Sequence, residues 1–391
     1  MSQRPIARSP DLLRLRNEGY DIRIQGGFLL VRDVPYVTAT RQVRRGTLVM
    51  ALNLMGDVAA KPASHVAFWS GEHPCHRDGS KIRAFEHSSG PQNFGNDVQA
   101  DHMFSAKADY RDYHHITTTY IGRIAGEAGE VEPGATAQTF PVVVAEDGSD
   151  VFRYVDTASS RAGIGAANNR VAGQRIGIVG LGGTGAYVLD LVCKTAVQEI
   201  HLFDGDVFSQ HNAFRAPGAP SIEQLAARPR KVAHFAQVYA ALRNGVVPHD
   251  TFIDGSNVSL LDGFDFIFLC MDGGAAKREI VAALNHTCTP FVDAGMGLLL
   301  SDVGRIGGLV RVTTSRPSSR EAASRHVAFA DASSMGGEYS TNIQVVELNA
   351  LNAALAVVSW KKVFSFYQTA GDEIYSGFSI RTGEVVTEVA E

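Results

Sequence analysis

A glycine-rich turn constrains this chain more than any other feature of its sequence. The turn is Gly180-Leu-Gly182-Gly183-Thr-Gly185; it follows the apolar run 176–179 and precedes the helical pattern 186–195. Glycine lets backbone amides approach a phosphate closely, and a helix N-terminus favours an anion. Asp204 ends the next predicted strand, 19 residues after Gly185, which is the spacing for a carboxylate on ribose hydroxyls. The pattern predicts a nucleotide site; the alternative is a tight turn without a ligand.

Strand and helix patterns alternate from Arg175 onward. The predicted strands are 176–179, 199–203, 264–270, 291–293 and 305–312, and the predicted helices are 186–195, 231–242, 275–286 and 341–358. Such alternation is typical of parallel strands joined by crossover helices. We therefore predict an α/β fold class: a Rossmann-like, mostly parallel sheet with flanking helices, followed by a hairpin at 378–386.

The preceding part of the chain has a different pattern. Strands are predicted at 20–25, 28–34, 47–54, 65–69, 116–124 and 140–144, and a helix only at 11–17. Gly26-Gly27 between the first two runs is a strong hairpin signal. We predict a β-rich α+β N-terminal domain at 1–150 and a connecting segment at 151–174, which is rich in Ala, Gly, Ser and Asn. The α/β domain would occupy 175–391.

Composition excludes several classes of protein. The chain has 391 residues, of which 45% are hydrophobic and 20% charged, and its net charge is −5. This mildly acidic balance gives no electrostatic footprint for nucleic acid. No apolar run approaches the roughly 18–20 residues of a membrane span, and the first residues lack the apolar core of a signal peptide. We expect a cytoplasmic protein without a membrane or nucleic-acid partner.

The four cysteines, Cys75, Cys193, Cys270 and Cys288, form no C-x-x-C pair. The sequence therefore supports neither a zinc ribbon nor a thioredoxin-like redox pair. The last three lie in apolar stretches, so we expect them to be reduced core residues.

Further polar residues follow the glycine turn in a set order. They are Asp204-Gly-Asp206, then Asn212-Ala-Phe-Arg215, then Lys231 at the start of a predicted helix, and Asp272 after a buried strand. Over residues 175–360 this combination resembles the ThiF/MoeB and ubiquitin-activating-enzyme superfamily in order and rough spacing. An NAD-dependent oxidoreductase would explain the glycine turn and Asp204, but it would leave the other residues without roles.

The resemblance implies an adenylation reaction. Members of the superfamily join a protein's C-terminal carboxylate to the α-phosphorus of ATP and release pyrophosphate. A carboxylate is already ionised at neutral pH, so the site must neutralise charge and align the reactants rather than remove a proton. The implied cofactors are ATP and Mg²⁺.

The resemblance also assigns roles, each with a plainer alternative. The implied positions are Gly180, Gly182, Gly183 and Gly185 under the nucleotide, Asp204 on the ribose, Asn212, Arg215 and Lys231 on the phosphates, Asp272 on Mg²⁺, and Asp206 near the metal. Arg215 and Lys231 could instead be surface charges, Asp272 a helix cap, and Asp206 a structural residue. Arg161 is the candidate for an arginine that reaches the partner subunit's ATP, which would make the protein a homodimer; the alternative is a linker arginine.

The chain departs from the superfamily in two ways. The zinc-binding C-x-x-C pairs of MoeB-type members are missing, so we expect no structural zinc. No cysteine occurs near 331–337, where many members carry a catalytic one. Three routes stay open: the enzyme stops at the acyl-adenylate, a serine accepts the acyl group as an oxyester, or the cysteine lies on a partner. Ser334 is the leading serine candidate, with Ser333 beside it, while Ser340 fits a helix N-cap better.

The whole arrangement resembles bacterial ThiF-type proteins with an uncharacterised N-terminal domain. Such proteins are typically encoded beside ubiquitin-like and conjugating-enzyme-like proteins, sometimes in antiphage defence loci. The resemblance thus implies an activating enzyme for a ubiquitin-like protein, with a conjugating-enzyme-like protein as a second partner. The alternatives are a sulfur-carrier-protein adenylyltransferase, an enzyme that adenylates a small molecule or a tRNA base, an NAD-dependent oxidoreductase, and a non-catalytic nucleotide-binding adaptor.

Overall fold

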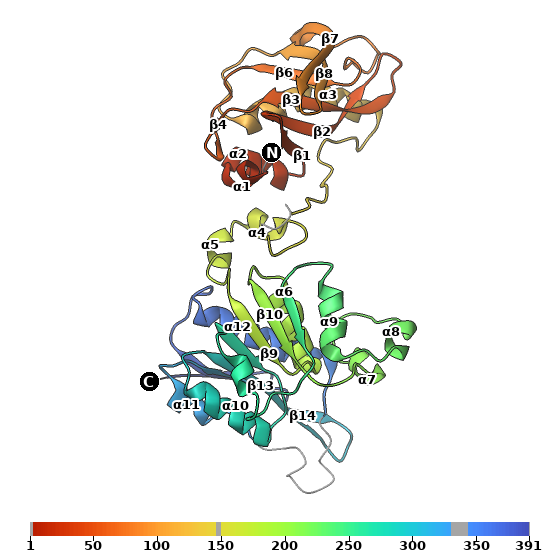
Figure 1. Cartoon of the computed structure of the whole chain (residues 1–391). Coiled ribbons are helices and arrows are strands. Elements are labelled where there is room, and N and C mark those ends of the chain that lie inside the picture. Colours follow the sequence, from red (N-terminus) through yellow and green to blue (C-terminus); the bar gives the residue numbers. More distant parts are fainter. Residues whose placement is uncertain (1–2, 146–149, 330–342, 391) are drawn as a thin grey trace. The chain divides into compact units, whose positions relative to one another are not determined.

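The computed structural model describes residues 3–145, 150–329 and 343–390 (Figure 1). The chain divides into two compact units, residues 1–147 and 148–391, and each is described by itself. Within the described ranges, no helix is both long and apolar enough to cross a membrane.

The first unit is built on an antiparallel sheet in the order β1-β2-β3-β6-β8-β7. Its strands are β1 Asp21–Gln25, β2 Phe28–Val37, β3 Val43–Ala51, β6 Val66–Ser70, β7 Glu86–Gly95 and β8 Val98–Ser105. The short strands β4 Leu54–Met55 and β5 Val58–Ala59 pair separately, and the helices are α1 Arg4–Arg8, α2 Pro10–Asn17, α3 Tyr113–Val131 and the 3₁₀ turn η1 Arg83–Phe85. The predicted hairpin is confirmed, because Gln25 pairs with Phe28 and both glycines between them have positive φ.

The predicted strand at 116–124 is wrong, because this stretch lies inside helix α3. Its β-branched residues suggested a strand, but the apolar side chains of Ile116, Tyr120 and Ile124 recur every four residues and are buried. The Asp112 side chain caps the helix by accepting a hydrogen bond from the backbone N–H of His115 at 2.7 Å. The predicted strand at 140–144 is also absent; the structure has only an isolated bridge residue there.

The second unit holds an eight-stranded sheet in the order β11-β10-β9-β12-β13-β14-β15-β16. The strands are β9 Arg175–Val179, β10 Glu199–Phe203, β11 Val246–His249, β12 Phe266–Leu269, β13 Phe291–Leu300, β14 Ile306–Ser315, β15 Glu373–Ser379 and β16 Val385–Val389. The first five strands in the sheet order are parallel, and β13 to β16 pair antiparallel. The predicted fold class is confirmed: a mostly parallel sheet with helices follows a β-rich unit.

Helices cover both faces of this sheet (Figure 1). The helices of this unit are α4 Thr157–Ala162, α5 Gly165–Asn168, α6 Gly183–Cys193, α7 Gln210–Ala213, α8 Ile222–Ala226, α9 Lys231–Tyr239, the 3₁₀ turn η2 Val258–Leu261, α10 Ala275–Asn285, α11 Arg320–Ser324 and α12 Val346–Val363. Of these, α6, α9 and α12 pack on one face of the sheet and α10 on the other. Successive side chains of β12 point to opposite faces of the sheet. Phe266 and Phe268 pack with α6 and α12, whereas Ile267 and Leu269 pack with α10.

The strand order locates the place where a ligand can bind. From β9 the chain moves outward through β10 and β11, then returns to pair β12 on the other side of β9. The crossover helices therefore diverge between β9 and β12. In open α/β sheets a crevice forms at such a switch point, outside the carboxyl ends of the strands.

Candidate functional site

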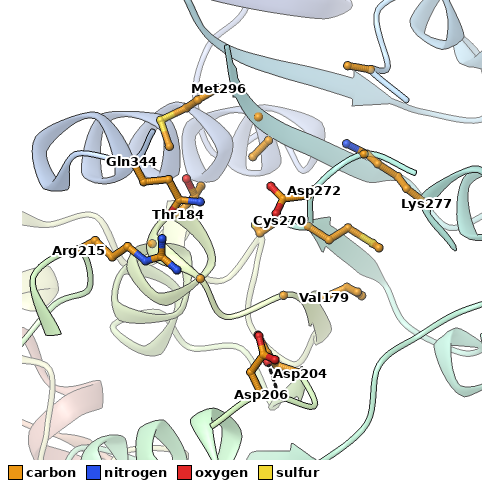
Figure 2. Close-up of a pocket in the computed structure, with 18 of the residues that line it drawn as sticks. Val179, Thr184, Asp204, Asp206, Arg215, Cys270, Asp272, Lys277, Met296 and Gln344 are labelled. Carbon is orange, nitrogen blue, oxygen red and sulfur yellow. Dashed lines mark hydrogen bonds between the residues drawn. The ribbon is translucent and has the colours of Figure 1, made fainter. Parts of the chain in front are cut away.

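A cavity of about 810 Å³ lies at the carboxyl ends of the central strands (Figure 2). Its lining comes from the glycine turn after β9, the segments after β10, β11 and β12, and strands β13 and β14. The cavity therefore lies at the switch point that the topology defines. It brings together Asp204, Asp206, Arg215, Lys231 and Asp272, which lie up to 68 residues apart in sequence.

The glycines of the turn serve two different purposes. Gly180 has a φ of 89°, and an added Cβ would lie 2.6 Å from the carbonyl oxygen of Cys270. A Cβ on Gly185 would lie 1.9 Å from the carbonyl oxygen of Gly180, so both positions require glycine for the fold. A Cβ on Gly182 would meet nothing within 4 Å, and this residue is the N-cap of α6 without a side-chain cap. The N-terminal amides of α6 are thus left open to an anion in the cavity.

Asp204 fastens the turn to the end of β10. Its carboxylate accepts hydrogen bonds from the backbone N–H of Leu181 at 2.7 Å and of Asp206 at 2.8 Å. The residue is only 5% exposed, yet it lines the cavity. A carboxylate in the cavity lining can contact a ribose, but that of Asp204 also has a structural role that the sequence did not reveal.

Lys231 lies buried against two carboxylates. Its Nζ donates to Oδ2 of Asp206 at 2.6 Å and to Oδ2 of Asp204 at 3.4 Å. The backbone N–H of Lys231 also donates to the carbonyl of Asp206 at 2.9 Å, so the first turn of α9 is tied to the segment after β10. Asp206 therefore positions the lysine, and its own side chain is about half exposed toward the cavity.

Arg215 and Asp272 line opposite sides of the cavity (Figure 2). The Nε of Arg215 is buried and, within the described ranges, has no hydrogen-bond partner. A buried charged donor without an acceptor is costly, which suggests that a ligand supplies the acceptor. Asp272 is exposed between β12 and α10, whose N-cap is Gly274 rather than the aspartate.

Four predicted site residues are not in the cavity lining as described. One is Gly185, which packs against the carbonyl of Gly180 within the turn. Asn212 is 3% exposed, and its Oδ1 accepts a hydrogen bond from the backbone N–H of Ser209 at 2.9 Å in the capping box of α7. Arg161 is exposed near the end of α4. Ser334 lies outside the described residues, as do Ser333 and Ser340. The phosphate contact of Asn212, the partner contact of Arg161 and the acyl acceptor role of Ser334 remain predictions.

Two protein-family models match the sequence of this chain. Residues 160–352 match the ThiF family, and residues 10–157 match a domain of unknown function, DUF6791. The chain contains a ThiF family domain. The superfamily resemblance drawn from the polar residues is thus confirmed for the part of the chain that holds the cavity.

The solved structures that match part of this chain are distant in sequence. PaaA is 16% identical with a TM-score of 0.43, over 57% of this chain and 75% of its own. Escherichia coli MccB with ATP is 14% identical with a TM-score of 0.43, over 59% and 67%. The same protein with AMPCPP and MccA is 13% identical with a TM-score of 0.45, over 60% and 70%. No curated protein matches the chain.

The ThiF domain also has an apolar wall that the sequence did not reveal. Phe252 and Ile253, which follow β11, line the cavity next to Asp204. The Phe252 side chain is 61% exposed, and an added Cβ on Gly205 would lie 2.6 Å from its ring. An exposed aromatic face of this kind can stack with a nucleobase. The sequence offered one signal for this wall, the aromatic residue Phe252, which comes shortly after strand β11, and that strand was not predicted.

Two asparagines on α12 were missed as well. Asn349 is fully buried; its Oδ1 accepts from the Thr184 hydroxyl at 3.1 Å, and its Nδ2 donates to the carbonyl of Arg215 at 3.4 Å. The Nδ2 of Asn352, also buried, donates to the carbonyl of Gly295 at 3.3 Å. Both connect α12 to the cavity wall, and two amides three residues apart among apolar residues were the available sequence signal.

Cys270 lines the cavity but is a poor nucleophile. Burial raises the pKa of its thiol to about 12, so the thiol is neutral at physiological pH. All four cysteines are free, and the prediction that Cys288 belongs to the core is wrong, because it is exposed.

The residues of the cavity suit a magnesium–nucleotide complex better than a protein-only metal site. Within the described ranges, no group of three or more His, Cys, Asp and Glu side chains could hold a metal ion. Mg²⁺ is commonly bound through one or two carboxylates together with substrate phosphates. Asp272 is placed to supply such a carboxylate.

Proposed function

We propose that this protein uses ATP and Mg²⁺ to adenylate the C-terminal carboxylate of a ubiquitin-like protein, with release of pyrophosphate. The main support is that one cavity in a ThiF family domain is lined by a helix N-terminus, two cations and an exposed carboxylate. The helix and the cations suit phosphates, and the carboxylate suits their metal ion. An NAD-dependent oxidoreductase would leave Arg215, whose buried Nε has no partner among the described residues, without a role.

Each part of the cavity has a task in this reaction. The base would stack on Phe252, the ribose would meet Asp204, and the α-phosphate would lie at the N-terminus of α6. Arg215 and Lys231 would offset the negative charge of the triphosphate and of the leaving pyrophosphate. Asp272 would hold Mg²⁺, which screens the phosphate oxygens when it is bound.

A polypeptide substrate also fits the outer end of the cavity. Leu298 and Leu299 of β13 line it, and Leu299, Leu300 and Val303 on the same hairpin are strongly exposed. A run of exposed apolar side chains beside a cavity commonly marks a contact surface for a partner. We propose that the tail of the ubiquitin-like protein enters along this hairpin, and that a conjugating-enzyme-like protein later receives it.

The proposal extends to a homodimer and to an acyl acceptor. Arg161 would contribute to the ATP site of the partner subunit, in a two-fold symmetric arrangement. Ser334 would accept the acyl group as an oxyester; otherwise the reaction ends at the adenylate, or a partner's cysteine takes over. An adduct that hydroxylamine releases and Ser334→Ala abolishes would support the serine route. An adduct that persists when Ser333, Ser334 and Ser340 are all replaced would exclude it.

Calorimetric titration tests the nucleotide site without any partner. We expect Mg²⁺-dependent binding of ATP, no binding of NAD, and weaker Mg²⁺-dependent binding in Asp272→Asn. Asp262→Asn is a matched control, because Asp262 is also exposed but lies outside the cavity lining. Tight NAD binding without a response to ATP would overturn the proposal, as would equal Mg²⁺ dependence in both variants.

A further inference from the structure

The inner wall of the cavity holds a second cationic group, separate from Arg215 and Lys231. We infer that Arg311 receives the carboxylate of the acyl substrate, and that Asp293 and Lys277 position Arg311 for this task. The inference rests on the proposed function, because it names the seat of the second reactant in the same cavity.

Arg311 lies where a glycine on the adjacent strand leaves room for its side chain. It pairs with Gly295 on β13 and with Gly377 on β15, its neighbours across the sheet. An added Cβ on Gly295 would lie 2.6 Å from Nη2 of Arg311, so the guanidinium lies back across the glycine of the adjacent strand. Both Arg311 and Gly295 line the cavity. The buried Asn352 holds the carbonyl of Gly295, which fixes this stretch of β13.

The charges around Arg311 leave it an excess of positive charge. Asp293 is fully buried; one of its carboxylate oxygens forms an ion pair with the buried Lys277, and the other meets Nη1 of Arg311 at 3.4 Å. Lys277 alone balances the charge of Asp293, so the three groups together carry a net charge of +1. Among the described residues, Asp293 is the only hydrogen-bonding or ion-pair partner of the Arg311 side chain, which leaves most of its five N–H donors for a ligand.

The reaction needs a cation at this place. The substrate carboxylate must approach the α-phosphorus of a triphosphate, and two anions repel each other strongly where water is excluded. One carboxylate oxygen, held by Arg311, becomes the carbonyl oxygen of the product. The other oxygen forms the new bond to the α-phosphorus, and the bond to the β-phosphate oxygen breaks with its electron pair leaving on pyrophosphate. A guanidinium fork suits a planar carboxylate.

Non-hydrolysable analogues test the inference without knowledge of the partner. The probes are N-acetylglycyl-sulfamoyladenosine, which carries an acyl group, sulfamoyladenosine, which lacks it, and ATP with Mg²⁺. In the unsubstituted protein we expect the acyl group to tighten binding by about tenfold or more, the worth of one hydrogen bond to a charged group. Arg311→Met should remove this gain, Arg311→Lys should keep part of it, and ATP affinity should change by less than about twofold, because Arg311 serves the acyl side.

Two further variants separate a substrate contact from a structural role. Gly295→Ala leaves the arginine in place but displaces its guanidinium, so it should also remove the acyl gain. Arg175→Met removes an arginine that is ion-paired on β9 outside the cavity lining, and it should keep the gain. The inference fails if the unsubstituted protein gains nothing from the acyl group, or if Arg311→Met keeps the gain or weakens ATP equally. If the unsubstituted protein did not bind ATP at all, the proposed function would be refuted instead.

Discussion

The ion triad of Lys277, Asp293 and Arg311 makes a ranked prediction about stability. Asp293→Asn removes the central charge and leaves the 1% exposed Lys277 side chain without its counter-ion. Breaking a buried ion pair in this way costs about 3–5 kcal/mol. Arg311→Met should cost the least, about 1 kcal/mol, because this arginine is 17% exposed and its contact is long. Lys277→Met should lie between them, since Arg311 still faces the carboxylate.

Urea unfolding followed by tryptophan fluorescence measures these costs. The two tryptophans are divided between the units, Trp69 in the first and Trp360, fully buried, in the second. In a Trp69→Phe background the signal therefore reports only the unit with the triad. For a slope of about 3 kcal/mol per molar urea, Asp293→Asn should lower the midpoint by about 1–1.7 M.

A double variant provides the control. Lys277→Met with Asp293→Leu replaces the buried pair by apolar side chains of similar size, which is often close to neutral. We expect it to unfold at a higher urea concentration than Asp293→Asn alone. Equal midpoints for Asp293→Asn and Arg311→Met would refute the charge arrangement described here, and so would a loss of less than about 1 kcal/mol in Asp293→Asn.

Three other expectations follow from the cavity wall. Gly185→Ala should destabilise the second unit by about 1–3 kcal/mol in urea unfolding, because its methyl group would meet the backbone of the turn. Gly182→Ala should keep the unfolding midpoint but weaken ATP binding in calorimetry, because its methyl group would enter the cavity. Iodoacetamide at pH 8 should label the exposed Cys288 and spare Cys270, whose raised pKa keeps its thiol protonated; peptide mass spectrometry reads this out, and comparable labelling of both would contradict it. Phe252→Ala should weaken ATP binding by about 1–3 kcal/mol and Phe252→Tyr should not, as measured by calorimetry; equal affinities would exclude stacking.

The parallel part of the fold was predictable because its signals are local. Each strand from β9 to β12 that the sequence predicted is a short apolar run. The turn after β9 is recognisable in the sequence because its backbone geometry requires glycines. Helix α3 was misread for a local reason too. Its threonines favour strands when taken alone, but Thr118 and Thr119 donate their hydroxyls to carbonyls one turn earlier, which accommodates them in a helix.

The cavity was less predictable, because several of its residues carry no sequence signal of a site. Lys277 lies in the first turn of helix α10, where a lysine is ordinarily a solvated surface residue, and only the fold places it against Asp293 on the next strand. Arg311 was the better clue, since it is the one charged residue of β14. A lone charge in a strand between two neighbours needs a counter-ion or a ligand, but the sequence cannot say which one.

Asp204 shows why binding data alone cannot assign a role in such a site. Its two carboxylate oxygens accept hydrogen bonds from different backbone N–H groups, of Leu181 and of Asp206. Asp204→Asn turns one acceptor into a donor that faces an N–H, which should cost about 1–3 kcal/mol of stability.

Asp204→Asn should also loosen the glycine turn, so the affinity for ATP would fall even if Asp204 made no contact with the ribose. Comparison of ATP with 2′,3′-dideoxy-ATP resolves the ambiguity. If Asp204 binds the ribose, the unsubstituted protein should prefer ATP and Asp204→Asn should lose the preference. A preference that survives in the variant would leave the carboxylate with its structural role alone.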